Sequence, residues 1–242
     1  MTPLKSIRHS KNMRRIKRDI ARGRMSVLCV SEPVLDNTDV HFVETVNHSA
    51  LMIPSDCQGN HPSCGGHATM NLIEWVMNTS GNPVPKNQQM DGYRLWKEKR
   101  LEEYGNLNGG LMLHEAVEAA IERDIIVGSY TYVSASEALA VLPSRPLLCG
   151  IKITTEWPRA SKDNGFIRSG GLTTGPHAEV LVGATINAGR KFVHLLNSWG
   201  TNHAWKGIET ISLELFLKRC FACIDIQAVP SNPEKYLKRW RG

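Results

Sequence analysis

The feature that most constrains this chain is the stretch 58–68, where a loop leads into a helix. Gln58 stands six residues before Cys64, and Gly59 and Pro62 between them favour an irregular loop. Beyond Cys64 the apolar side chains recur with helical spacing, at Met70, Ile73, Trp75, Val76 and Met77. The pattern therefore predicts that Cys64 lies at or near the N-terminus of a helix.

A cysteine in that place is a candidate nucleophile. The free amide hydrogens and the dipole of a helix N-terminus favour a thiolate over a thiol. The side-chain amide of Gln58, brought back by the loop, could donate to an oxyanion formed beside the sulfur. Many buried cysteines begin helices without any chemistry, so the interpretation needs further residues.

Two later stretches supply them. Residues 175–183 read Gly-Pro-His-Ala-Glu-Val-Leu-Val-Gly, and residues 193–201 read Val-His-Leu-Leu-Asn-Ser-Trp-Gly-Thr. With the Gln-(five residues)-Cys start, they resemble the papain family (C1) of cysteine peptidases, in family order. His177 follows Cys64 by 113 residues and Asn197 follows His177 by twenty, a compact version of the family spacing.

The resemblance implies an α+β, two-lobe papain-like fold: a helical N-terminal lobe, an antiparallel β-barrel-like C-terminal lobe, and an active-site cleft between them. It implies a triad in which Cys64 attacks, His177 holds the thiolate as an ion pair, and Asn197 orients the imidazole. Gln58 and the backbone amide of Cys64 would stabilise the oxyanion, and Trp199 would pack over the His–Asn pair. No metal or cofactor is expected.

The resemblance also gives expectations for substrate binding. Gly109 and Gly110, adjacent glycines that allow close backbone pairing, would line one cleft wall. Leu111, Met112 and Ala178 would line the main specificity pocket, and their apolar character indicates a hydrophobic side chain at the second substrate position.

Several positions depart from the family pattern. Gly65 stands where tryptophan is usual, and Pro176 where Asp, Asn or a small residue is more common. Glu179 replaces an apolar strand residue and is expected to be a buried acid near the histidine. Four histidines have no matched role and are interpreted as structural or surface residues: His67, His114, His194 and His203.

Cysteine usage predicts a disulfide-poor protein. The positions that the family pairs in a disulfide are His61 and Leu107 here, which points to a reducing compartment. Cys220 and Cys223 have the CxxC spacing of redox or zinc sites, but no second pair accompanies them. We interpret them as buried structural cysteines.

Charge divides the chain into three parts. The formal net charge is +6, yet residues 1–24 hold nine basic residues and one acid, and residues 234–242 hold four basic residues and one acid. We expect a basic arm with a short strand over 1–39, a peptidase domain over 40–230 and a basic tail over 231–242. The ends would bind an acidic protein partner or nucleic acid, lie across their own domain as a short blocking arm, or remain solvated.

Within the domain, the helical lobe is expected over about 46–127 and the sheet lobe over about 128–230. Further helices are predicted over 93–103, 113–126 and 134–142. Strands are predicted over 130–133, 147–153, 178–184, 192–196 and 208–212, with a loop over 163–176.

The predicted function is hydrolysis of peptide bonds in a peptide or protein substrate, through a thioester acyl-enzyme. The alternative is an assembly subunit of a larger particle, such as a phage virion, with weak or no peptidase activity. No apolar run is long enough for a membrane span, and no secretory signal is recognised. We therefore expect no membrane partner, and a location in the cytoplasm, another reducing compartment or a virion.

Overall fold

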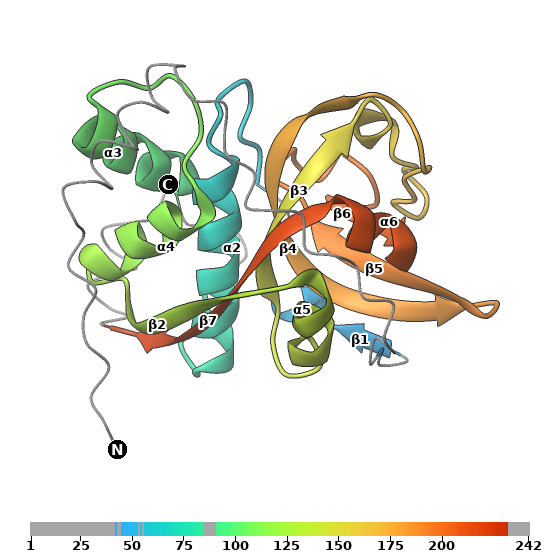
Figure 1. The fold of residues 1–242 in the computed structure, drawn as a ribbon. Coiled ribbons are helices and arrows are strands. Elements are labelled where there is room, and N and C mark those ends of the chain that lie inside the picture. The colour runs from blue at the N-terminus through green and yellow to red at the C-terminus, as the bar shows by residue number, and fades with distance from the viewer. Residues whose placement is uncertain (1–41, 43–44, 53, 55, 85–90, 232–242) are drawn as a thin grey trace.

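The computed structural model describes residues 42, 45–52, 54, 56–84 and 91–231 (Figure 1). The predictions for the basic arm, for nearly all of the basic tail and for Cys29 fall outside these residues. In the described part of the chain, no helix is both long and apolar enough to span a membrane.

Three helices pack together on one side of the molecule in Figure 1: α2 (Cys64–Thr79), α3 (Gly92–Tyr104) and α4 (Leu113–Glu122). α2 contacts both of the others and also the sheet. α3 begins where the Asp91 side chain accepts from the backbone amide of Arg94, and it ends at Gly105, whose φ of 66° favours glycine. These helices confirm the predicted helical part.

Helix α4 is shorter than the predicted span of 113–126. It stops at Glu122, and Asp124 then adopts a φ of 56°, in the left-handed region. That reversal sends Ile125 and Ile126 into the core as the chain enters a strand. The apolar pair extends the helical spacing in the sequence, although Ile125 lies in the connection and Ile126 begins the strand that follows.

A seven-stranded sheet forms the rest of the domain, and all its strand pairings are antiparallel. Its order is β2-β7-β3-β4-β5-β6, and β1 pairs with β4 beside this path. The strands are β1 (Thr45–Asn47), β2 (Ile126–Val133), β3 (Leu147–Thr154), β4 (Thr173–Asn187), β5 (Arg190–Leu196), β6 (Ile208–Ser212) and β7 (Cys220–Pro230). The mixed helical and antiparallel architecture is the one predicted.

Four short helices complete the fold: η1 (Ser49–Leu51), α5 (Ala135–Val141), η2 (Trp157–Arg159) and α6 (Leu213–Arg219). The helix predicted over 134–142 is α5, and Ser134 and Glu137 close a capping box at its start. Helix α6 was not predicted, and the Ser212 side chain caps it by accepting from the backbone amide of Leu215. The loop predicted over 163–176 ends earlier than expected, because β4 already begins at Thr173.

Two apolar cores lie on either side of β4. Val180 and Val182 join the core under the helices, whereas Leu181 and Ala184 join the core between the sheet, α5 and α6. Residues 180–182 alternate with the period of two of a strand, and the register shift between Leu181 and Gly183 brings Ala184 to the same core as Leu181. The first strand, β1, also pairs with β4, so residues 46 and 47 belong to the sheet rather than to the helical lobe. The expected boundary between the helical and sheet lobes, at 127/128, falls inside β2. β4 is thus the element shared by the two halves.

Candidate active site

Cys64 is the first residue of α2, and its side chain is half-buried. Burial raises the pKa of its thiol, while the backbone amides of Ala178, Gly65 and Cys64 itself point at the sulfur and oppose that rise. One of these amides, that of Ala178, belongs to β4 and to the residue that directly follows His177.

His177 and Asn197 form a buried pair. The Nε2 atom of His177 lies 2.9 Å from the Oδ1 atom of Asn197, and both side chains are enclosed. The backbone amide of Ser198 also donates to Oδ1, at 2.6 Å, which fixes that atom as the acceptor. Nε2 therefore carries the hydrogen, and Nδ1 is the basic nitrogen of the neutral ring.

Trp199 covers this pair. Its ring centroid lies 5.0 Å from that of His177, with an angle of 37° between the planes. The indole is half-buried and packs over the His–Asn pair, as the resemblance to the papain family implies. It shields the hydrogen bond between them from water.

The pKa values of Cys64 and His177 do not favour the expected thiolate and imidazolium. Burial lowers the pKa of His177 to about 4, with a smaller lowering from His203, and the hydrogen bond to Asn197 only partly opposes it. The pKa of Cys64 is raised, again chiefly by burial. Burial therefore favours a neutral thiol at Cys64 and a neutral imidazole at His177 at neutral pH, because it penalises the charged form of each.

Gln58 is held between the loop and the segment that follows Asn197. Its Nε2 donates to the carbonyl of His61 at 2.7 Å, and its Oε1 accepts from the Ser198 hydroxyl at 2.5 Å. Its backbone amide donates to the carbonyl of Ser198 at 2.8 Å. One of the two hydrogens on Gln58 Nε2 is thus used in the bond to His61, and only the second could donate to an oxyanion.

The predicted cleft wall lies beside the start of α2. A Cβ atom built on Gly65 would lie 3.5 Å from the carbonyl oxygen of Leu111. Gly109 has a φ of 98° and open space around it, and its carbonyl accepts from the indole of Trp96 at 3.2 Å. Gly110 is exposed as well. The structure thus brings the glycine loop next to Cys64.

The apolar residues expected in the specificity pocket differ in exposure. Leu111 is half-buried, Met112 is 48% exposed, and Ala178 is buried against the helical core. Leu111 lies beside Gly65 and Ala178 lies beside the Cys64 sulfur, so these two residues border the candidate nucleophile from opposite elements.

Sequence reasoning missed two residues next to the pair. Glu209 accepts from Asn197 Nδ2 at 2.5 Å, and its Oε1 lies 2.6 Å from His203 Nε2. The His203 ring also meets Trp199, with a centroid separation of 4.8 Å. A signal was present in the sequence, because Glu209 has the same strand parity as the core residue Ile211.

The remaining candidate histidines have structural partners, as expected. His67 pairs with Asp56, His114 with the hydroxyl of Tyr132, and His194 with Thr185 and Thr210. The expected buried acid, Glu179, is fully enclosed, and its Oε1 lies 3.9 Å from His177 Nε2.

A cluster of three thiols lies apart from the triad in the second core. The sulfur of Cys223 is 3.3 Å from those of Cys149 and Cys220, and all three are buried. Three thiolate sulfurs could coordinate a soft metal ion, but no fourth ligand lies with them among the described residues. We keep the interpretation as structural thiols. The five described cysteines are all free.

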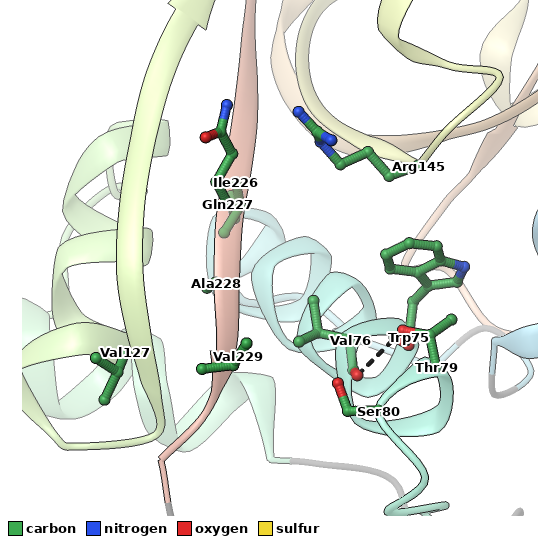
Figure 2. Close-up of a pocket in the computed structure, with 10 residues that line it drawn as sticks. All are labelled: Trp75, Val76, Thr79, Ser80, Val127, Arg145, Ile226, Gln227, Ala228 and Val229. Carbon is green, nitrogen blue, oxygen red and sulfur yellow. Dashed lines mark hydrogen bonds between the residues drawn. The ribbon is translucent and has the colours of Figure 1, made fainter.

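A cavity of about 460 Å³ lies near the C-terminal end of α2, at the opposite end from Cys64 (Figure 2). A helix of 16 residues is roughly 24 Å long, so this cavity is remote from the candidate nucleophile. Its lining includes Trp75, Val76, Arg145 and Val229, and none of the predicted site residues.

Comparison with known proteins assigns the fold. The structure is similar to xylellain, a cysteine protease from Xylella fastidiosa, with a TM-score of 0.63 and 15% identity over 77% of this chain and 86% of that one. It is similar to digestive procathepsin L 3 of the Tenebrio molitor larval midgut, with a TM-score of 0.61 and 16% identity over 84% and 73% of the two chains. The proform of the ragweed cysteine protease Amb a 11 gives a TM-score of 0.60 and 18% identity over 79% and 66%.

The chain therefore has the fold of papain-like cysteine proteases. Neither a family model nor a curated protein matches it by sequence. The likeness that these comparisons show is one of fold.

Proposed function

We propose that this protein is a cysteine peptidase that hydrolyses peptide bonds through Cys64, His177 and Asn197. The observation that carries the proposal is the buried hydrogen bond between His177 on β4 and Asn197. Strand β4 packs against α2, the helix that Cys64 begins, so the thiol starts a helix that contacts the strand of this histidine. Thiol, base and orienting amide together are the arrangement that nucleophilic catalysis needs.

The first half of the reaction follows from the neutral resting pair. Nδ1 of His177 accepts the thiol proton while the sulfur bonds to the substrate carbonyl carbon, and the carbonyl electrons move onto its oxygen. The backbone amide of Cys64 and the free amide hydrogen of Gln58 stabilise this oxyanion. The imidazolium then gives its proton to the leaving nitrogen as the C–N bond breaks, and a thioester remains.

The second half reverses the proton path. His177 takes a proton from water as its oxygen attacks the thioester carbon. The C–S bond breaks, and the sulfur recovers a proton from the imidazolium. Asn197 holds the ring in one orientation throughout, because its Oδ1 accepts from Nε2 in both charge states. No step needs a metal or a cofactor.

Substrate selection would come from the glycine loop and β4. Gly109 and Gly110 leave an extended substrate backbone free to approach the loop. Leu111, Met112 and Ala178 present apolar surface, which favours a hydrophobic side chain at the second substrate position. The alternative of a purely structural subunit gains no support, because the basic ends that suggested it lie outside the described residues.

Matched cysteine variants test the proposal. Cys64→Ala removes the sulfur and should lower turnover of a peptide substrate with a hydrophobic second residue by at least about 10³-fold. Cys57→Ser alters an exposed cysteine seven positions earlier and should leave kcat/KM within about twofold. Equal activity of Cys64→Ala and wild type would overturn the proposal.

A further inference from the structure

Two carboxylic acids lie buried next to the proposed triad. Glu179 on β4 and Glu209 on β6 are both 0% exposed. Glu179 Oε1 lies 3.9 Å from His177 Nε2 and Glu209 Oε1 lies 2.5 Å from Asn197 Nδ2, so the two acids converge on the hydrogen-bonded His–Asn pair and interact with one another. Among the described residues, their ion-pair partners are histidines, and no lysine or arginine pairs with either acid. Two ionised carboxylates without a cation would repel strongly at this depth, so their interaction requires a proton between them.

The hydrogen bonds around the pair lead directly to the triad. Oε1 of Glu209 accepts from Nδ2 of Asn197 and from Nε2 of His203. Oε1 of Glu179 accepts from the indole of Trp157 at 3.2 Å. The second oxygen of each carboxyl is sealed from solvent, and no donor group of the described residues reaches it. That is the arrangement expected when these oxygens share a proton.

We propose that Glu179 and Glu209 form a proton-sharing carboxyl pair that positions Asn197, and through it the ring of His177, for the reaction proposed above. Both are positioning residues, since neither reaches the sulfur or the substrate carbonyl. The inference about catalysis rests on the proposed function, whereas the existence of the pair does not.

Among the described residues, no group that faces the pair supplies a cation at neutral pH, so the protonated form is favoured. The pair faces His177 on β4, His203 in the loop after β5, Trp157 on η2 and Cys220 on β7. Burial lowers the pKa of both histidines, so neither supplies a cation at neutral pH. Burial likewise raises the pKa of Glu209 to about 8 and that of Glu179 well above its usual range.

The orientation of the Asn197 side-chain amide depends on two hydrogen bonds, one to His177 and one to Glu209. Oδ1 of Asn197 must face His177, and a side-chain amide can rotate by half a turn and exchange its oxygen and nitrogen. Glu209 prevents this, because an acceptor beside Nδ2 would meet a second acceptor if Oδ1 turned toward it. An apolar residue at position 209 would remove this acceptor from a buried amide nitrogen.

Three variants of Glu209 test the positioning. Glu209→Ala should lower kcat about 10–100-fold with KM within about threefold, because the orientation of His177 is lost while the cleft is kept. Glu209→Gln should recover kcat to within about threefold of wild type, since its Oε1 still accepts from Asn197 and its amide replaces the shared proton toward Glu179. Glu209→Leu repeats the deletion with the volume filled, in case the alanine variant does not fold.

Glu118→Gln is the matched control. Glu118 is a partly buried carboxyl on α4 that accepts from the Tyr130 hydroxyl at 2.8 Å, away from the triad, and its replacement should leave kcat unchanged. Wild-type kcat in both Glu209→Ala and Glu209→Leu would overturn the positioning role.

Two readouts do not depend on activity, and they can be taken in the Cys64→Ala background. The infrared carbonyl band of a protonated carboxyl should be present at pH 7 and should disappear in Glu179→Gln/Glu209→Gln. The imidazole Nε2–H resonance of His177 should exchange slowly in wild type and Glu209→Gln, and rapidly in Glu209→Leu. Absence of the infrared band would overturn the proton-sharing pair. A protein with this band and no peptidase activity would refute the proposed function and leave the pair standing.

Discussion

At the scale of single residues, burial decides the chemistry of the site. His177 and Cys64 lie in an enclosed space, and the loss of water raises the pKa of the thiol and lowers that of the imidazole. The helix N-terminus and three backbone amides favour the thiolate, but they do not outweigh that loss. In the proposed mechanism, the thiol therefore carries its proton before substrate binds, and neutral His177 is the base that accepts it.

This charge state predicts how activity depends on pH. Protonation of His177 removes its ability to accept the thiol proton, so kcat/KM should fall as the pH drops through about 4. The ordinary histidine value of 6.5 would place the fall more than two pH units higher. The measurement is kcat/KM against pH, with the fold checked at each pH by circular dichroism.

The same state can be seen without substrate. The ultraviolet thiolate absorbance of wild type minus that of Cys64→Ser should be absent at pH 7. A fall of kcat/KM centred near pH 6.5, or a full thiolate signal at pH 7, would contradict the neutral pair.

At the scale of elements, the start of α2 is set by how closely α3 approaches it. A Cβ atom on Gly66 would lie 2.2 Å from the carbonyl oxygen of Gly92, and one on Gly92 would lie 2.5 Å from Cα of His67. The two glycines let the helix backbones touch. The propensity cost of Gly65-Gly66 in a first turn is therefore offset by packing at the second glycine.

Alanine at these two adjacent positions should have opposite effects. Gly66→Ala forces the α2 and α3 backbones apart and should lower the free energy of unfolding by about 2–3 kcal/mol, with loss of turnover because Cys64 shifts. Gly65→Ala meets only ordinary contacts with Leu111 and should stabilise the helix by up to about 1 kcal/mol. Urea unfolding of both variants against wild type measures this, and equal stabilities would contradict the packing.

At the scale of the whole molecule, β4 joins the two halves and carries His177 between them. Much of this could be predicted from sequence. Helical spacing after Cys64 predicted α2, and the strand patterns predicted the positions of β3, β5 and β6 closely. The residues of the candidate site could be listed because they stand in short, ordered motifs.

The remainder depended on tertiary contacts that no local pattern encodes. Helix α4 was predicted too long, because the apolar pair beyond its end is Ile125, in the connection, and Ile126, the first residue of β2. His203 and Glu209 lie in a loop and a strand, and they become neighbours of Asn197 only when β5 and β6 pair. Glu179 could be predicted as buried, but its partner could not.

The most direct test of the account is covalent labelling by an epoxide-type inhibitor of thiol peptidases, with the modified residue mapped by mass spectrometry. The account predicts one adduct, on Cys64, although Cys57 is the more exposed thiol. Labelling should slow at least about tenfold in His177→Ala, since the base that takes the thiol proton is gone. Labelling of Cys57 in preference to Cys64, or an unchanged rate in His177→Ala, would contradict the account.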